Sequence, residues 1–339
     1  METAFNDLEI ACLLRVFSFL TPKDCARASC VHPLWNSVAG DNAVWKPHLA
    51  ADYAASSAAA PDGSEAATYR AAYAAWHTAY ADVAGPLLAR TLACWRRIEA
   101  YLQQHSPQIL ATLNPGATAQ QVAQAEAELG HPLPLAVRCI YRVHNGQDLR
   151  LHQRGASGGP PPNLLMGLFG CLIFYDHVTS NALQSLEEMV QKTALFRSIR
   201  PMGARHPLLL SNHVVFAHSF KPNDKVCVLD AGTGGVYQKL PHSRDWPLAP
   251  AADTYPGACD GMLRWMEEYA RRLSEGWYGG CESDSSVKGP LEEAVKGPLE
   301  EAGITVGGAI SLFPRAYPAA ATAITRGVQV RQRLGDLHV

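Results

Sequence analysis

The glycine-rich stretch VLDAGTGG, at residues 228–235, is the part of this sequence that most invites a chemical interpretation. An apolar run ends in an acid, Asp230, and three glycines follow within five residues. In methyltransferases a loop of this kind wraps the methionine end of S-adenosylmethionine. Such a loop must open a helix, because the free backbone N–H groups at the start of that helix point at the ligand. The residues after the loop therefore decide between a cofactor site and a plain turn.

The residues after the glycines favour a turn. Five residues, VYQKL, separate the last glycine from a proline, and they suit a strand better than a helix. No alternation of strands and helices follows, although a parallel sheet would require one. The pattern predicts a β-hairpin with strands at 225–229 and 236–240, and we expect no cofactor.

Other patterns give no sign of catalysis or metal binding. The sequence has no H-E-x-x-H and no G-x-x-x-x-G-K-[ST] motif. Nine cysteines lie scattered without a C-x-x-C pair, so no structural metal is expected. The carboxylate pairs Glu187/Glu188 and Glu267/Glu268 fall on helix-like segments, where solvated helix faces explain them. We therefore predict neither a catalytic residue nor a metal ligand.

Charge and composition exclude further classes of function. The 339 residues carry a net charge of −2 at pH 7, so no basic field is available to attract nucleic acid. The longest apolar stretch, residues 163–175, is too short to span a bilayer and contains two glycines. The first ten residues lack the basic region of a signal peptide, and scattered cysteines favour a reducing compartment. We expect a cytoplasmic or nuclear protein with no nucleic-acid or membrane partner.

The first fifty residues have the pattern of short helices around one small core. The segment LLRVFSFL, residues 13–20, is almost wholly apolar. Thr21 can cap a helix whose first residue is Pro22, and a break is predicted near Pro33. A unit of this size buries little surface by itself, so it is expected to rely on a neighbour or a partner.

Longer helices are predicted after a low-complexity loop at residues 54–67. Apolar residues spaced three or four apart give one helix a buried face: Leu88, Leu92, Trp95, Ile98 and Leu102. Thr118 and Gln121 form a capping box at the start of the next helix, and Gly130 ends it. A further helix is predicted to end at Asn145-Gly146.

Beyond Gly146 the sequence changes to strand-like segments. These lie at residues 168–176, 206–220, 224–230 and 235–240. Parallel strands need crossovers of about a dozen residues or more, which the region from 206 to 240 does not supply, so the sheet is predicted to be antiparallel. A last amphipathic helix is predicted within residues 260–276. The octapeptide VKGPLEEA then occurs twice in tandem, at 287–302, and is expected to be an exposed linker.

Residues 13–45 resemble an F-box. The family frame is an aliphatic-Phe pair, a Leu, a Pro, a Ser-x-Val and two tryptophans about ten residues apart. The matching residues are Val16, Phe17, Leu20, Pro22, Ser29, Val31, Trp35 and Trp45. The family's opening Leu-Pro corresponds to Leu8-Glu9, where the proline is missing. The resemblance implies that an adaptor of the Skp type contacts Leu8, Leu13, Val16, Phe17, Leu20, Pro22, Val31 and Trp35.

Two later segments resemble further domains. Residues 117–148 resemble the start of a SUKH domain, the Smi/Knr-like fold, in which helices pack on a mostly antiparallel sheet. The end of the chain resembles the start of an ApaG β-sandwich, of which about thirty residues remain out of the hundred or so that such a sandwich needs. This order of domains resembles the plant Skp-interacting F-box proteins and the animal F-box only protein three. The ApaG domain is either lost, or the chain is a truncated or alternatively spliced product.

The predicted fold is α+β with five parts. They are an all-helical F-box (1–50), a linker and connecting helix (51–86), a SUKH-like domain (87–276), a low-complexity linker (277–308) and a truncated ApaG-like fragment (309–339). The resemblance implies a non-catalytic substrate receptor of an SCF-type cullin-RING ubiquitin ligase. Its F-box would bind the adaptor, and through it cullin and RING subunits, while the SUKH-like domain would bind an unknown protein substrate. The alternative is an interaction scaffold outside any ligase, which the missing proline at Glu9 and the lost ApaG domain favour.

Overall fold

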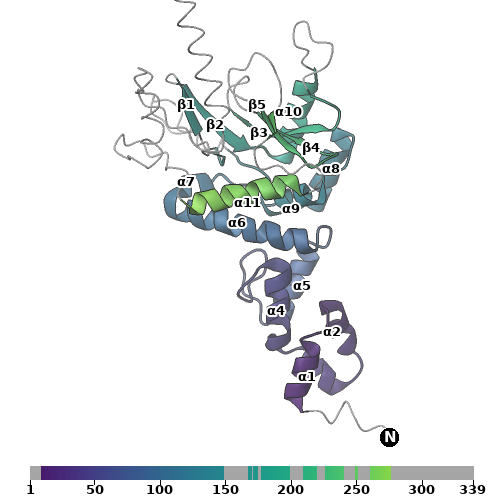
Figure 1. The fold of residues 1–339 in the computed structure, drawn as a ribbon. Helices are drawn as coiled ribbons and strands as arrows, with labels where there is room; N and C mark the ends of the chain where they lie inside the picture. Colours follow the sequence, from purple (N-terminus) through teal and green to yellow (C-terminus); the bar gives the residue numbers. More distant parts are fainter. Residues whose placement is uncertain are drawn as a thin grey trace, which may run out of the picture.

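The computed structural model describes residues 9–148, 167–169, 171–174, 177–198, 209–219, 226–239, 249–250 and 260–275. Within these residues the fold is α+β, as predicted: helices fill the N-terminal part, and an antiparallel sheet follows with two further helices. Figure 1 shows α1 and α2 at one end, then α4 and α5, then a layer containing α6 and α11, and the sheet beyond that layer. The predicted linker and the ApaG-like fragment, residues 277–339, lie outside the described residues.

The helices before the sheet are α1 (Ile10–Phe17), α2 (Pro22–Ala28), α3 (Pro33–Ala39), α4 (Asn42–Tyr53), α5 (Tyr69–Ala79), α6 (Pro86–His105), α7 (Pro107–Leu110), α8 (Ala119–Leu129) and α9 (Leu135–Val143). The strands are β1 (Cys171–Phe174), β2 (His177–Leu183), β3 (His213–Ser219), β4 (Val226–Asp230), β5 (Val236–Lys239) and β6 (Ala249–Pro250). Helix α10 (Leu186–Ser198) lies between β2 and β3 in the chain, and α11 (Gly261–Ser274) follows β6.

Capping side chains start α2, α3 and α4 of the N-terminal unit. Thr21 Oγ1 accepts a hydrogen bond from the backbone N–H of Asp24 at 3.2 Å, and Pro22 is the first residue of α2, as predicted. His32 and Asp41 cap α3 and α4 in the same way. Most of the buried residues of α1 to α4 form one small core: Leu13, Phe17, Cys25, Val38, Ala39, Val44 and Trp45. Leu49 and Tyr53, near the end of α4, pack in a separate cluster with α5 and α6.

Helix α6 is the longest described helix and presents the predicted apolar face. Leu88, Leu92, Trp95, Ile98 and Leu102 are all buried along it. At 20 residues it is about 30 Å long, enough to touch both the N-terminal helices and the sheet-bearing part. The predicted loop between α4 and α5 is also present, since residues 54–68 form no helix.

The ends of α8 and α9 show one confirmed prediction and one correction. The Thr118–Gln121 capping box starts α8, and Gly130 ends it with a φ of 81°. Helix α9 was expected to end at Asn145-Gly146 but ends at Val143, with His144 as its cap. Gly146 does have a left-handed φ of 73°, but it belongs to the connection that brings α9 against the start of α10.

Each strand of the described sheet pairs with its neighbours in the chain. The order is β1-β2-β3-β4-β5-β6 and every pairing is antiparallel, as predicted. Alternate residues of β4 face opposite sides: Cys227 and Leu229 join the main core, while Val226 and Val228 pack in a second cluster with Phe196 of α10. The main core also takes side chains from α6, α8, α9 and α11. No helix in the described part of the chain is long and apolar enough to cross a membrane.

Candidate protein-interaction surface

The glycine-rich stretch is a hairpin turn whose acid bonds to the turn itself. Strands β4 and β5 pair antiparallel on either side of it, which confirms the predicted hairpin. The Asp230 carboxylate accepts hydrogen bonds from Gly232 N at 2.8 Å and from Thr233 Oγ1 at 2.8 Å. Burial acts to raise the pKa of Asp230, but the hydrogen bonds from Thr233 and Gly232 outweigh burial and leave the pKa below its usual value. The acid that would begin a cofactor loop therefore shapes a turn.

This turn predicts a pH-dependent contribution to stability. A carboxylate with a lowered pKa in the folded state stabilises fully above its unfolded pKa, near 4, and loses that contribution as the pH falls through the folded pKa. We expect Asp230→Asn to destabilise the protein by about 1–2 kcal/mol at pH 7, and by less as the pH falls below about 4. Urea unfolding at several pH values measures the difference. The exposed Glu65→Gln is the control, and a pH-independent effect at Asp230 would contradict the assignment.

Of the four paired carboxylates, Glu267 joins two helices, and the other three make contacts within four residues of the chain. Glu267 accepts a bidentate pair from Arg90, at 2.7 and 3.0 Å, which joins α11 to α6. Glu268 pairs with Arg271 and Arg272 at 2.6 Å each within α11. Solvation is therefore only part of the explanation for Glu267 and Glu268, whose side chains are 32% and 23% exposed and pair with guanidinium groups. These contacts are structural, and no group of His, Cys, Asp and Glu among the described residues is arranged to hold a metal ion.

Exposed apolar side chains gather in the N-terminal unit. Of the seven large apolar side chains that are exposed among the described residues, four belong to it: Ile10, Val16, Phe19 and Val31. Their exposed fractions run from 41% for Val16 to 73% for Phe19. The guanidinium carbon of Arg15 lies 4.8 Å from the centre of the Phe19 ring. These exposed side chains make the N-terminal unit the candidate for a protein-binding face.

The residues predicted for adaptor contact fall into three groups. Val16 and Val31 are exposed. Leu20, Pro22 and Trp35 are half-buried, and Leu20 and Trp35 pack against the core.

Leu13 and Phe17 lie inside the core, at 1% and 2% exposure, and Phe17 packs edge-on against Trp35 with ring centres 6.1 Å apart. Leu8 lies outside the described residues. The sequence prediction did not include Ile10 and Phe19, because an almost wholly apolar helix gives no sign of which side is buried.

The comparisons with known proteins agree with this geometry. A family model described as F-box-like matches residues 11–49, which include nearly all of α1 to α4. The chain is 28% identical over 323 residues to F-box protein SKIP16 of Arabidopsis thaliana, a match that covers 93% of the chain and 67% of that protein. It is also 33% identical over 104 residues to a KNR4/SMI1 homolog of Eremothecium gossypii. The chain is therefore similar to F-box proteins and, over 104 residues, to a KNR4/SMI1 homolog.

The animal relatives match a shorter part of the chain. F-box only protein 3 of Mus musculus is 30% identical over 93 residues, which cover 27% of the chain and 16% of that protein. The match to the fungal KNR4/SMI1 homolog likewise covers 30% of the chain and 16% of that protein. The plant match therefore covers most of the chain. The matches to the animal and fungal relatives cover only a small share of those proteins.

The F-box keeps its backbone geometry where the family proline is missing. Glu9 immediately precedes α1 with a φ of −55° and a ψ of 143°. A proline fixes φ near −65°, so Glu9 adopts a backbone conformation that a proline would also favour. A carboxylate before the first turn also suits the positive end of the helix dipole. The substitution at Glu9 is therefore compatible with a normally placed α1.

One short motif was missed in the sequence. The letters GASGG, at residues 155–159, match the G-x-S-x-G pattern of a serine-hydrolase elbow. Three prolines follow within the next three residues, and they are incompatible with the helix that such an elbow opens. The segment lies outside the described residues.

Proposed function

We propose that this chain is a substrate-recognition subunit of an SCF-type cullin-RING ubiquitin ligase. Its F-box binds a Skp-type adaptor, and its SUKH-like domain binds the protein substrate. The observation that carries the proposal is the exposed apolar surface of the F-box, with Ile10, Val16, Phe19 and Val31 left outside its core. The match to an F-box-like family over the same helices supports it.

The size of the exposed surface fits an adaptor contact. Burying one large aliphatic or aromatic side chain stabilises by about 1.5–3 kcal/mol, so four of them supply several kcal/mol toward association. The half-buried Leu20, Pro22 and Trp35 would extend the contact. Leu13 and Phe17 contribute to the contact indirectly, because their packing in the core holds α1 in place.

The chain would position a substrate and leave the chemistry to other subunits. Ubiquitin transfer belongs to the enzymes that the cullin and RING subunits recruit, so no catalytic residue, cofactor or metal is assigned here. The cytoplasm or nucleus, where such ligases act, is the proposed compartment. The alternative of a scaffold outside any ligase rested on the missing proline and on the shortened ApaG-like fragment. The φ of −55° at Glu9 weakens the first of these arguments.

Adaptor binding by the full chain tests the proposal. We expect the Val16→Asp, Val31→Asp double variant to bind a purified Skp-type adaptor about a hundredfold more weakly than the wild type, because two charges would be buried at the contact. The matched control is Leu195→Asp, Leu210→Asp, which changes two exposed leucines outside the F-box. We expect the control to bind like the wild type.

Each outcome has a clear meaning. Circular dichroism establishes that both double variants are folded. Equal binding by the F-box variant and the control would place the contact elsewhere. A folded wild-type chain that does not bind the adaptor would overturn the ligase assignment and leave the scaffold as the better explanation.

A further inference from the structure

Two arginines of the SUKH-like part meet the ends of α4, the last helix of the F-box, and of α5, the helix that follows it. In Figure 1, α4 and α5 lie between α1 and the helical layer. Helix α4 ends at Tyr53, followed by Ala54 with a left-handed φ of 52°, and α5 ends at Ala79. The last carbonyls of a helix have no donor within the helix, and the backbone dipoles make that end negative. A cation that donates hydrogen bonds at this end pairs with the free carbonyls and offsets the negative charge of the dipole.

Arg96 of α6 meets the end of α4. Its Nη2 donates to the carbonyl of Tyr53 at 3.0 Å, and its Nη1 donates to the carbonyl of Ala54. Its guanidinium carbon also lies 5.8 Å from the ring centre of Trp76, on α5. One side chain from the helical layer thus holds the end of α4 and the face of α5.

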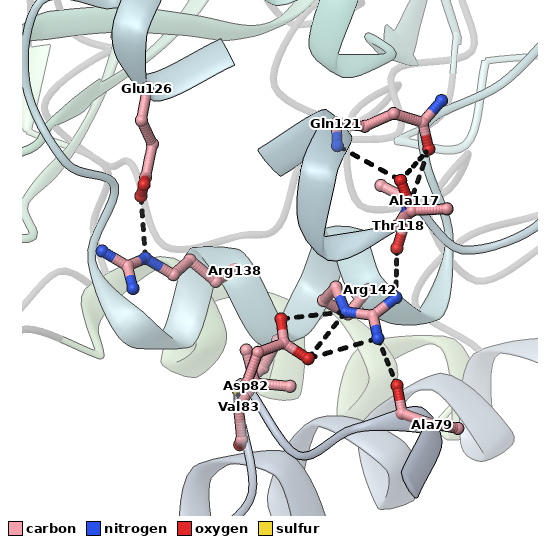
Figure 2. Close-up of polar contacts among 10 residues, drawn as sticks. Ala79, Asp82, Val83, Ala117, Thr118, Gln121, Glu126, Arg138 and Arg142 are labelled. Atoms are coloured by element: carbon pink, nitrogen blue, oxygen red, sulfur yellow. Dashed lines mark hydrogen bonds and ion pairs between the residues drawn. The ribbon is translucent and has the colours of Figure 1, made fainter. Parts of the chain in front are cut away.

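Arg142 of α9 meets the end of α5 (Figure 2). Its Nη2 donates to the carbonyl of Ala79, and its Nη1 donates to the carbonyl of Ala117, just before α8. Its Nε lies 3.1 and 3.3 Å from the two carboxylate oxygens of Asp82, in the turn after α5. Only 12% of the Arg142 side chain is exposed. The residue therefore ties α5 and its turn to the SUKH-like part.

An unbroken series of aromatic contacts joins these arginines to the F-box core. The ring of Trp45, which belongs to that core, lies 5.1 Å from Tyr73, and Tyr73 lies 5.3 Å from Tyr53. Tyr53 stacks on Trp76 at 5.6 Å, and Trp76 stacks on Tyr80 at 5.5 Å. The guanidinium carbon of Arg142 lies 5.3 Å from the centre of the Tyr80 ring, so the packing continues into α9.

We propose that Arg96 and Arg142 are positioning residues that lock the F-box to the SUKH-like domain in one fixed orientation. We call this pair the arginine clamp. Each arginine donates hydrogen bonds at the carboxyl end of one helix, α4 or α5, and neither arginine belongs to the F-box. The use of this clamp rests on the proposed function, because a rigid receptor holds its substrate at a set distance and direction from the adaptor. The clamp itself is a property of the isolated chain.

Distance measurements on the full chain test the clamp. Spin labels are attached through p-acetylphenylalanine at two exposed positions, Lys23 in the F-box and Ala123 on α8, and pulsed electron resonance gives the distance distribution. We expect a narrow distribution in the wild type. In the Arg96→Met, Arg142→Met double variant the width should increase at least about twofold, since methionine keeps much of the packing but donates no hydrogen bond.

The controls separate positioning from folding. Arg97→Met changes an exposed arginine on the same helix and should leave the width unchanged. Arg142→Lys retains the charge without the planar fork, so it should give an intermediate width. Circular dichroism and adaptor affinity should match the wild type in every variant, because the F-box itself is intact.

Two results would overturn the clamp. They are a wild-type distribution as broad as that of the double variant, and an unchanged width in the double variant. If the double variant fails to fold, the single Arg142→Lys variant decides by the same measurement. The distance measurement is made on the chain without adaptor. Its result therefore tests the clamp separately from the proposed ligase role, which the adaptor affinity tests.

Discussion

Gly146→Ala is expected to destabilise the protein by about 4 kcal/mol or more, whereas Gly130→Ala should cost only about 1 kcal/mol. Both glycines have left-handed φ angles, 73° and 81°, so both substitutions carry the same backbone penalty. At Gly146 an added Cβ would also lie 2.3 Å from the backbone N of Ser185 and 2.5 Å from the carbonyl C of Gln184. At Gly130 nothing lies within 4 Å.

Chemical denaturation of the two glycine variants measures the difference. The backbone at Gly146 is fixed from both sides, since its carbonyl accepts a hydrogen bond from Asn114 N at 2.9 Å. The start of α10 therefore has no easy way to move away from an added methyl group. Equal effects at the two positions would mean that the close approach between the end of α9 and the start of α10 does not hold in solution.

Phe17→Ala is expected to lower the free energy of unfolding of the F-box by about 3–5 kcal/mol. The ring is 2% exposed and packs edge-on against Trp35, in a core of only seven buried residues. Val16→Ala removes an exposed side chain from the same helix, so it should leave the stability almost unchanged while weakening adaptor binding.

Measuring stability and adaptor affinity for both variants distinguishes a residue that stabilises the core from a residue that contacts the adaptor. Under the proposed division, Phe17→Ala loses binding only through unfolding, and a stabilising condition restores much of it. If Phe17→Ala left stability unchanged but abolished binding, Phe17 would be a contact residue, as the family resemblance first implied. The same comparison applies to Leu13, which is also buried in the core.

Local sequence signals predicted the elements well. The caps at Thr21 and Thr118, the apolar face of α6 and the hairpin around Asp230 all follow from interactions within a few residues of the chain. Such interactions leave a pattern in the sequence, because a cap and its partner or two residues of one helix face have fixed spacings. The antiparallel sheet followed from connections too short for parallel crossovers.

Contacts between distant segments left no comparable pattern. Arg142 and Asp82 are 60 residues apart, and Arg90 and Glu267 are 177 apart, so only the packed helices show that these charges meet. This is why Glu267 was expected to be simply solvated. The F-box surface was only partly predicted for a related reason: Val16 and Phe17 are both apolar neighbours on α1, and only tertiary packing shows that one is exposed and the other buried.

The choice of arginine for these contacts has a chemical consequence for the surface. Arginine supplies the cation at both clamp positions and in the Arg90 and Arg138 ion pairs, and no lysine occurs anywhere from residue 47 to residue 191. A guanidinium group stays protonated and is not a target of ubiquitin attachment, whereas a lysine amine is. Across this whole stretch, the chain therefore offers ubiquitin no side-chain amine on which to form an isopeptide bond.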